Sequence, residues 1–356
     1  MTVSSHFNVA VIGPGLVGSE FIAQITSCKK PIFKVIGLAN SRRMLLCPSG
    51  LSAGSWKKEL ESSSTQADLP KLIEYAASHK PCVVVDCTSS DAVAEQYPEW
   101  MQKGLHIVTP NKKGFSGDYA LWKKIRDAHS PRSLVYHEST VGAGLPILST
   151  LDDLIATGDE IVRIEGIFSG TLSYLFNNFS SKEWTDTFSK TVSVAKELGY
   201  TEPDPRDDLN GMDFARKVVI LGRLAGLSLD LKTLSVENVV PEELRGVPTP
   251  AEFLEKLPSY DSHFDSLKKD AQKSNGVLRY VGVIDPKGES SVKLKRYPLD
   301  HPFASLTGSD NIIAFTTKRF PSPLIIQGAG AGAAVTAFGM FSDLLKIARS
   351  VTPASA

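Results

Sequence analysis

The feature that most constrains the fold is a glycine-rich turn near the amino terminus. An apolar strand over residues 8–12 leads directly into Gly-Pro-Gly-Leu-Val-Gly, and residues 19–27 continue with helical spacing. Glycines in such a turn let the backbone approach a pyrophosphate, while the helix amino terminus supplies amides and a positive dipole. The pattern predicts a dinucleotide-binding domain, with a turn kept for tight packing as the alternative. The expected contacts are Gly13, Gly15, Leu16, Val17 and Gly18.

The end of the next strand bears on which dinucleotide is bound. A strand is predicted over Phe33–Ala39, and it is followed by Asn40, Ser41, Arg42 and Arg43. A site selective for NAD usually has an acidic residue about 20 residues after the glycines, and no acid stands here. Arg42 and Arg43 could accept a 2′-phosphate, with surface arginines as the alternative. We therefore expect NADP to be used at least as well as NAD, with Asn40, Arg42 and Arg43 at the site.

Two further buried strands end in polar residues. Residues 83–86 run into Cys-Thr-Ser-Ser, and residues 107–109 run into Pro-Asn-Lys-Lys. In an open parallel sheet, ligands bind outside the carboxyl ends of the strands. Thr88, Ser89 and Lys112 are therefore expected in the cofactor crevice, and Lys112 could also reach a substrate.

The carboxyl-terminal segment repeats the strand, glycine turn and helix order. A strand is predicted to begin at Leu324, the glycine turn that follows contains Gly332, and a helix continues to about Arg349. A second dinucleotide site is improbable because no further alternating strands and helices follow. We expect this segment to return to the first domain, where Gly332 would lie at the cofactor.

Length and composition suggest two domains in an ordinary water-soluble protein. The chain has 356 residues, is 42% apolar and 22% charged, and carries no net charge, so neither nucleic acid nor an anionic membrane is expected as a partner. Its four cysteines lack metal-type spacing and are expected to be reduced in a cytoplasmic protein. The predicted domains are 1–150 for the nucleotide and 151–323 for the substrate, with 324–356 returning to the first.

The stretch from Tyr200 to Leu224 is the strongest candidate for chemistry. It opens as an acidic, proline-containing loop and becomes a helix from about Leu209. Asp213 and Lys217 are four residues apart on this helix, so their side chains can meet. Because the helix is apolar nearly all round, we expect the pair to face an internal cleft rather than solvent. Burial disfavours the charged ammonium and a carboxylate favours it, so the pair could hold a transferable proton; a structural buried pair is the alternative.

The loop before this helix concentrates carboxylates. Their number predicts a guest that carries a positive amino group. A second polar turn, Ser-Gly-Thr at residues 169–171, presents small hydroxyl groups before another helix, where a substrate could bind. The loop carboxylates are Glu202, Asp204, Asp207 and Asp208.

Glu138 precedes a tight turn, Val-Gly-Ala-Gly-Leu-Pro at residues 141–146. Such a turn exposes carbonyl oxygens, and oxygen ligands suit hard cations. A plain chain reversal is the likelier alternative from spacing alone.

In the second half of the chain, strands are predicted over residues 161–168, 278–284, 292–297 and 311–317, which indicates a mixed or antiparallel sheet. Its apolar face needs a cover, which a partner subunit could provide.

Taken together, these motifs resemble homoserine dehydrogenase in its short form, without a kinase or regulatory domain. The resemblance covers nearly the whole chain and depends on five segments. Among them the second and fourth are the most specific. In order, they are GPGLVG, TPNKK, EGIFSGTLSYLF, YTEPDPRDDLNGMDFARK and QGAGAGAAVTA.

The resemblance implies a Rossmann-type doubly wound parallel sheet plus an α+β substrate and dimerisation domain with a mixed sheet. It implies NAD(P)-dependent interconversion of L-homoserine and L-aspartate 4-semialdehyde on the route to threonine, methionine and isoleucine, in a cytoplasmic homodimer. Lys217 would be the proton donor or acceptor, Lys112 and Asp213 would assist, and a structural sodium ion would bind at the turn. The implied substrate residues are Glu202, Asp213, Thr171, Tyr200, Asp208 and Lys112, and the implied sodium ligands are Glu138, Val141, Ala143 and Leu145.

Two other hypotheses are kept beside this one. The first is another amino-acid dehydrogenase on the same scaffold. The second is an NADP-sensing module without chemistry, which Asp213, Lys217 and Lys112 disfavour. Aspartate-semialdehyde dehydrogenases resemble the amino-terminal half but need a nucleophilic cysteine, and none of the four cysteines follows a suitable turn.

Overall fold

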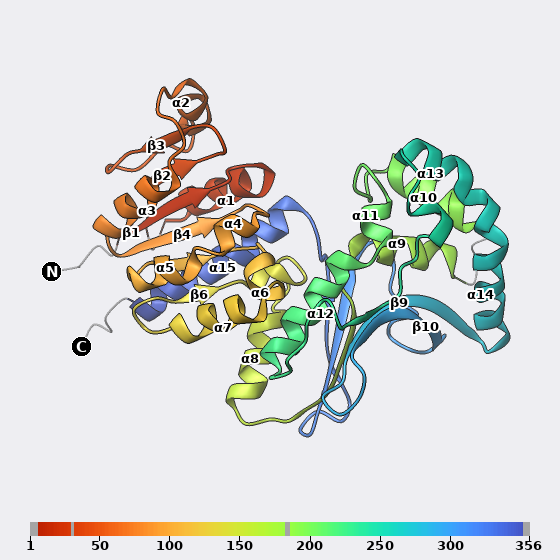
Figure 1. The fold of residues 1–356 in the computed structure, drawn as a ribbon. Coiled ribbons are helices and arrows are strands. Elements are labelled where there is room, and N and C mark those ends of the chain that lie inside the picture. Colours follow the sequence, from red (N-terminus) through yellow and green to blue (C-terminus); the bar gives the residue numbers. More distant parts are fainter. Residues whose placement is uncertain (1–5, 30–31, 182–185, 352–356) are drawn as a thin grey trace. The chain divides into compact units, whose positions relative to one another are not determined.

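The computed structural model describes residues 6–29, 32–181 and 186–351 (Figure 1). Backbone contacts divide the chain into unit 1, residues 1–146 and 332–356, and unit 2, residues 147–331. The predicted boundaries at residues 150 and 323 differ from these. The second is too early, because the strand Leu324–Gly328 pairs within the sheet of unit 2.

Unit 1 contains a sheet of six strands in the order β3-β2-β1-β4-β5-β6. Strands β2, β1, β4, β5 and β6 are parallel, and the short edge strand β3, which was not predicted, is antiparallel to β2. The order reverses between β1 and β4, as in a doubly wound fold. The strands are β1 His6–Ile12, β2 Ile32–Ala39, β3 Met44–Leu46, β4 Cys82–Asp86, β5 His106–Val108 and β6 Val135–Tyr136.

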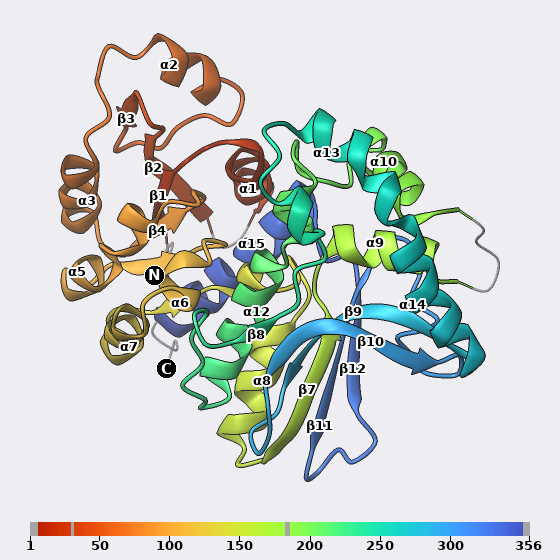
Figure 2. The ribbon, with the colours of Figure 1, turned by 45° about the vertical axis from the view of Figure 1, so that its right-hand side comes forward.

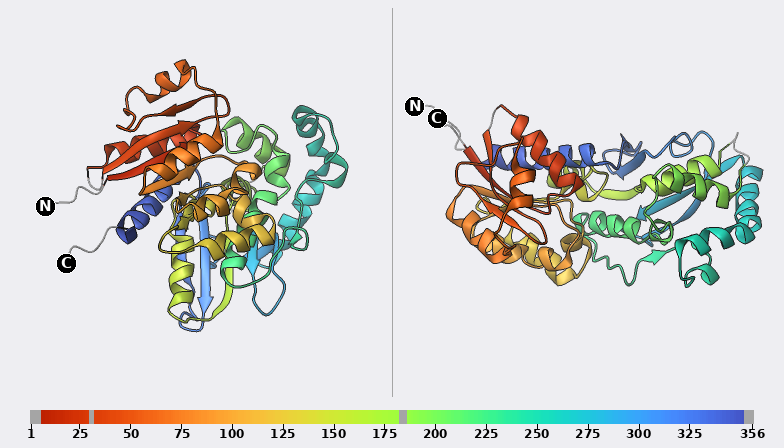
Figure 3. Two further views of the ribbon diagram at one scale, coloured as in Figure 1. Left: turned by 60° about the vertical axis from the view of Figure 1, so that its left-hand side comes forward. Right: turned by 90° about the horizontal axis from the view of Figure 1, so that it is seen from above.

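Helices cover this sheet, and its core is built from residues far apart in sequence. Apolar side chains of β1, β2 and β4 pack with those of α1 and of the carboxyl-terminal helix α15, the blue helix in Figure 3. The last helix is therefore an integral part of unit 1. The helices are α1 Leu16–Ser27, α2 Trp56–Ser62, α3 Leu69–Ser78, α4 Asp91–Ala94, α5 Tyr97–Gln102, α6 Lys113–Ser116, α7 Tyr119–Ala128, the 3₁₀ helix η1 Glu138–Thr140 and α15 Ala333–Val351.

Unit 2 contains a mixed sheet in the order β12-β11-β7-β9-β10-β8, as Figure 2 shows. All pairs are antiparallel except β8 with β10. The predicted fold class is thus confirmed in both units, although β8 was not anticipated. The strands are β7 Ile161–Ile167, β8 Ser235–Val236, β9 Gly276–Ile284, β10 Ser291–Pro298, β11 Asn311–Thr317 and β12 Leu324–Gly328.

The helices of unit 2 include the one predicted to carry the chemistry, with a corrected start. A short helix, α11, ends at Leu209, and α12 begins at Met212 after Gly211, which has a left-handed φ of 75°. No helix among the described residues is long and apolar enough to span a lipid bilayer. The helices are α8 Ile147–Ala156, α9 Gly170–Phe179, α10 Phe188–Glu197, α11 Arg206–Leu209, α12 Met212–Leu224, η2 Glu242–Leu244, α13 Pro250–Lys256, η3 Leu257–Tyr260 and α14 Asp261–Lys273.

Candidate active site and cofactor site

The glycine loop of unit 1 lies at the carboxyl end of the central strand β1, beside the point where the strand order reverses. Gly13 has φ of 76°, and a Cβ atom there would lie 2.8 Å from Thr88 Cγ2, so the β1 and β4 loops touch. Helix α1 begins at Leu16 after Gly15, and no side chain caps its amino terminus. Its first amides are therefore available to an anion, which fits the pyrophosphate of a dinucleotide.

The polar turn after β2 is ordered by its asparagine. The Asn40 Oδ1 atom accepts hydrogen bonds from the amides of Arg42 at 2.8 Å and Arg43 at 2.7 Å. Both arginine side chains are exposed. Asn40 thus shapes the turn, and the two guanidinium groups remain accessible to solvent at the edge where the 2′-phosphate of NADP was expected.

The β4 and β5 loops are tied to a buried carboxylate that no sequence motif indicated. Asp86 ends β4 with no exposed surface, and its Oδ1 accepts the amide of Thr88 at 2.8 Å. Asn111, next to Lys112, donates to Asp86 Oδ2 at 3.0 Å. Burial raises the pKa of Asp86, while hydrogen bonds from Tyr97 and Asn111 act in the opposite direction. The loops that carry Thr88, Ser89 and Lys112 are therefore held by one acid.

The turn after β6 contains two consecutive residues with left-handed backbone conformation. Gly142 and Ala143 both have left-handed φ values, 72° and 54°. The buried Glu138 contacts the Lys346 ammonium at 3.1 Å through Oε2, and its amide donates to Asp343 at 2.8 Å. Since Lys346 and Asp343 lie on α15, the turn is fastened to the last helix, and Glu138 has a structural role that the sequence did not reveal.

Gly332 lies at the start of α15 and belongs to unit 1. It has φ of 111°, and its carbonyl accepts both the amide and the hydroxyl of Thr336, at 3.0 and 2.8 Å. The residue therefore shapes the entrance to the helix. Its contact with a cofactor stays a prediction.

In unit 2 the predicted lysine and aspartate meet. Lys217 is 8% exposed, and its Nζ lies 2.8 Å from Asp213 Oδ2. The same ammonium donates to the carbonyl oxygen of Phe168, at the end of β7, at 2.6 Å. Helix α12 supplies both charged residues, and Phe168, directly after β7, supplies the neutral acceptor. The result is a shielded ammonium held between a charge and a dipole.

The expectation that both members of the pair are buried is wrong for Asp213. Its side chain is 54% exposed, while that of Lys217 is 10% exposed. The first turn of α12 projects beyond the core, so that Met212 is also exposed. The apolar character of the helix predicted burial correctly from Phe214 onward but not for the residues before it. An exposed carboxylate beside a shielded amine can meet a ligand from solvent.

A second polar cluster joins α9 to the acidic loop. The Thr171 hydroxyl donates to Asp208 Oδ1 at 2.8 Å, and also approaches the Tyr200 carbonyl at 2.7 Å. The Glu202 amide donates to Asp208 Oδ2 at 2.8 Å. Burial raises the pKa of Asp208, and the charges of Glu202 and Asp213 raise it further. These carboxylates therefore lie close enough to repel one another, as suits a site for a cation.

Tyr200 contributes a ring as well as a carbonyl. It stacks on Tyr174 of α9, with ring centroids 4.3 Å apart.

The two remaining acids of the loop, Asp204 and Asp207, form no hydrogen bond with Asp208 in the described residues. Asp204 forms a close ion pair with Arg206, whose guanidinium holds the pKa of that carboxyl below its usual range. Asp207 is exposed. Of the four loop carboxylates, Glu202 and Asp208 thus form one cluster, Asp204 belongs to a structural ion pair and Asp207 faces solvent, a division that spacing could not show.

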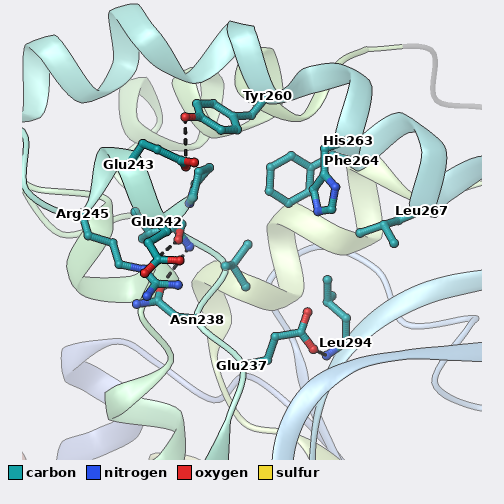
Figure 4. Close-up of a pocket in the computed structure, with 13 residues that line it drawn as sticks. Glu237, Asn238, Glu242, Glu243, Arg245, Tyr260, His263, Phe264, Leu267 and Leu294 are labelled. Atoms are coloured by element: carbon teal, nitrogen blue, oxygen red, sulfur yellow. Dashed lines mark hydrogen bonds between the residues drawn. The ribbon is translucent and has the colours of Figure 1, made fainter.

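Unit 2 also has a pocket of about 280 Å³ that the sequence did not indicate (Figure 4). Glutamates and apolar side chains line it, and the Tyr260 hydroxyl donates to Glu243 at 3.1 Å. Lys217 and Asp208 do not line it. Among the described residues, no group of three or more histidine, cysteine, aspartate or glutamate side chains could hold a metal ion.

Comparisons with known proteins agree with the geometry. A family model described as homoserine dehydrogenase matches residues 146–345, and one described as homoserine dehydrogenase, NAD binding domain, matches residues 13–137. The homoserine dehydrogenase of Saccharomyces cerevisiae is 50% identical over 351 residues, 96% of this chain and 98% of the yeast protein. Chloroplastic bifunctional aspartokinase/homoserine dehydrogenase 1 of Arabidopsis thaliana is 49% identical over 96% of this chain, which spans 38% of that protein.

Solved structures show the same fold. A Candida auris protein of unknown function is 49% identical, with a TM-score of 0.91, over 97% of this chain and 99% of that one. A hyperthermophilic archaeal homoserine dehydrogenase in complex with NADPH is 24% identical, with a TM-score of 0.72, over 96% and 98% of the two chains. At that identity the likeness shows the fold alone.

Proposed function

The chain belongs to the homoserine dehydrogenase family, NAD(P)-dependent oxidoreductases of amino-acid biosynthesis, and we propose that Lys217 manages the proton when it interconverts L-homoserine and L-aspartate 4-semialdehyde. One observation carries this proposal. The Lys217 ammonium is shielded from water and is held at 2.8 Å by Asp213 and at 2.6 Å by the Phe168 carbonyl. A shielded amine fixed by a carboxylate is suited to general acid–base chemistry.

The bound nicotinamide supplies hydride exchange at the carbon that bears the reacting oxygen. Lys217 then has a defined task. Its amine takes the hydroxyl proton when the alcohol is oxidised, and its ammonium returns a proton to the aldehyde oxygen in the reverse direction. Asp213 and the Phe168 carbonyl orient the amine throughout, since both contact Nζ. No covalent intermediate with the protein is needed.

Four residues of unit 2 would bind the amino-acid part of the substrate. Asp208 and Glu202 supply negative charge for the substrate ammonium, and Thr171 orients Asp208 through its hydroxyl. The backbone carbonyl of Tyr200 also lies within hydrogen-bond distance of the Thr171 hydroxyl and helps to hold it in place. We further propose that Lys112, in unit 1, assists at the substrate. The clustered acids support a cationic amino group as the recognised feature.

The test replaces Lys217 by alanine. With homoserine as substrate and the change in nicotinamide absorbance as the readout, we expect Lys217→Ala to lose about 10³-fold or more in kcat while still binding NADP⁺. The matched control is Lys256→Ala on α13. Lys256 also follows an acid by four residues and contacts Glu252 at 2.6 Å, but its side chain is 52% exposed. The control should keep full turnover. Full turnover in Lys217→Ala would refute the assigned role.

We propose that the cofactor is NADP at least as readily as NAD. The exposed Arg42 and Arg43 support this, because no acidic residue at the end of β2 would repel a 2′-phosphate. The measurement compares kcat/KM for NADP⁺ and NAD⁺ in the parent protein and in Arg42→Ala. A selective loss with NADP⁺ is the expected result, and equal losses with both cofactors would contradict it.

We also propose a monovalent cation, sodium by the family resemblance, at the turn of Glu138, Val141, Ala143 and Leu145. Carbonyl and carboxylate oxygens suit a hard cation, and Gly142 and Ala143 have the left-handed φ values of a tight turn. The Lys346 ammonium already contacts Glu138 Oε2. A cation bound beside it is therefore repelled less if it carries one positive charge than if it carries two. The measurement is thermal unfolding in sodium chloride against tetramethylammonium chloride at equal ionic strength. Equal midpoints would remove this part of the proposal.

A further inference from the structure

Unit 1 has a pocket of about 770 Å³ at the edge of its sheet that lies opposite the glycine loop. The residues that line it include those just before β4 and β6 and the first residue of β5. Strands β4, β5 and β6 are parallel to β1, so their amino ends share one edge, while the glycine loop follows the carboxyl end of β1. The five residues of β4 place the two edges about 16 Å apart. A ligand in this pocket would therefore leave the expected dinucleotide site free.

The described residues that line this pocket include three cations and no acid. Lys80 precedes β4, Lys103 follows α5 and Arg132 lies in the turn before β6, and all three are exposed. Lys103 contacts Glu99 at 3.5 Å, while Lys80 and Arg132 form no ion pair with described residues. Helices α5 and α7 also end here, and each carboxyl end contributes at most about half a negative charge. Since Lys80 and Arg132 carry two positive charges, a positive excess remains and favours an anion.

A buried histidine adds a hydrogen-bond donor to the cations. His106 lines the pocket and is 4% exposed, and its Nδ1 atom accepts the Leu134 amide at 3.0 Å. Burial lowers the pKa of His106 to about 4, so the ring is neutral at pH 7 and its proton lies on Nε2. Nε2 forms no hydrogen bond within the described residues, yet it is not sealed from solvent. Because the ring lines this pocket, the free Nε2–H donor opens into it.

Gly104 shows where the Lys80 ammonium lies. A Cβ atom at Gly104 would lie 2.9 Å from Lys80 Nζ and 3.9 Å from the Arg132 carbonyl oxygen. The ammonium therefore lies over this glycine, beside the turn that carries Arg132, and a larger side chain would displace it. After burial and the charge of His129, the charge of Lys80 is the next cause that lowers the pKa of His106. The ammonium and the imidazole donor are thus close enough to act on one ligand.

We propose that this pocket binds a small oxyanion with more than one negative charge, held by Lys80, Arg132 and the Nε2–H group of His106. A guanidinium fork matches the oxygens of a carboxylate or a phosphate, and an ammonium adds a point charge. Polycarboxylates and phosphates share this chemistry. The volume lies within the range of small-molecule sites, about 300–1,000 Å³. The inference does not depend on the proposed function, because the pocket and the glycine loop lie at opposite edges of the sheet.

Isothermal titration calorimetry of the full chain tests the proposal with citrate and with pyrophosphate at constant ionic strength. Citrate represents the polycarboxylates, pyrophosphate represents the phosphates, and acetate is the singly charged control. We expect citrate or pyrophosphate to bind with a dissociation constant of about 0.1–1 mM and acetate to bind more weakly. Absence of binding by both multivalent anions at millimolar concentration overturns the inference, as does acetate binding of equal strength.

Two exposed positions locate the bound anion. Lys80→Met keeps most of the hydrocarbon stem and removes the charge, and Arg132→Ala removes the guanidinium. Each should weaken binding by about tenfold or more. Lys123→Met is the matched control, because Lys123 is an exposed lysine of α7 that does not line the pocket, and it should keep the parent affinity. Affinity that is unchanged in the first two variants, or equally reduced in all three, overturns the inference.

His106→Asn tests the buried donor. The asparagine side-chain oxygen can replace Nδ1 as the acceptor of the Leu134 amide, but nothing replaces Nε2–H. We expect the anion to bind about five- to tenfold more weakly to this variant. Unchanged affinity would overturn the assignment of His106 to the site. If His106→Asn does not fold, Lys80→Met and Arg132→Ala still decide the question, since both positions are exposed.

Discussion

At the scale of single residues, the shielded amine of Lys217 is paired with the exposed carboxylate of Asp213, whose charge also acts on Asp208 of the acidic loop. We expect Asp213→Asn to lower kcat/KM for homoserine by about 10- to 100-fold, because the amine loses the carboxylate that orients it. The free energy of unfolding should change by about 1 kcal/mol or less, since the Asp213 side chain is 54% exposed and solvent screens its charge. Steady-state kinetics and urea unfolding measure the two effects.

Asp265→Asn is the control for this prediction. Lys268 on α14 is also 8% exposed, and Asp265 lies 3.6 Å from it on the same helix with a side chain that is 33% exposed. The pair has the same kind of asymmetry but packs on Phe179 instead of meeting the acidic loop. Activity should survive Asp265→Asn. Equal losses of activity in the two variants would mean that the Asp213 effect is a general disturbance of unit 2.

At the scale of elements, helix α12 depends on the glycine that precedes it. Gly211 has φ of 75°, and a Cβ atom there would lie 2.1 Å from the Tyr280 hydroxyl oxygen. We expect Gly211→Ala to lower the free energy of unfolding by about 2–4 kcal/mol, from backbone strain and overpacking together. Gly199 has nearly the same φ, 76°, with no atom within 4 Å of an added Cβ. Gly199→Ala should therefore cost about 1 kcal/mol, and equal costs in urea unfolding would contradict the packing argument.

The acidic loop is held by an ion pair whose contribution depends on pH. Asp204 and Arg206 have side chains that are 24% and 15% exposed, and Arg206 also donates to the Val247 carbonyl at 2.6 Å. The Arg206 guanidinium lowers the pKa of Asp204, so folding favours the ionised carboxylate. The stability from this pair is complete above the unfolded pKa, about 3.9, and is lost as the pH falls through the lower folded value.

Asp204→Asn should accordingly lower the free energy of unfolding by about 1–2 kcal/mol at pH 7. The difference from the parent protein should shrink as the pH falls below about 4. Urea unfolding across this range measures it, with Asp207→Asn at the exposed neighbouring acid as the control. A difference that stays constant down to pH 3 would show that the loss is due to shape rather than charge.

At the scale of the whole molecule, the expected assembly is a homodimer. In unit 2, β12 is an edge strand of the sheet, and Ile325 on it is 41% exposed. Edge strands with exposed apolar residues invite pairing with another chain. Sedimentation equilibrium should therefore give twice the mass of one chain at micromolar concentration. A single-chain mass over that range would contradict the prediction.

Much of the fold was predictable because it depends on local patterns. The strand, glycine turn and helix at residues 8–27 identified the dinucleotide unit, and the alternating strands of unit 2 identified a mixed sheet. The edge strands β3 and β8 were missed since three and two residues carry too little pattern. The start of α12 was placed too early, at Leu209, because the break at Gly211 depends on a close approach to Tyr280. Two parts of the candidate site were predictable from residue spacing: the contact between Asp213 and Lys217, and the acidic loop that precedes their helix.

The sequence by itself determined the class of each unit, the glycine loop and the helical pairing of Asp213 with Lys217, because these follow from spacings of a few residues. Only the tertiary structure decided that Asp213 is exposed, that Asp204 pairs with Arg206 and that Thr171 meets Asp208. It alone brought Tyr97 and Asn111 to Asp86, and Lys346 to Glu138 across 208 positions of sequence. Such partners are set by how strands and helices pack, and burial and charge balance depend on that packing rather than on local order.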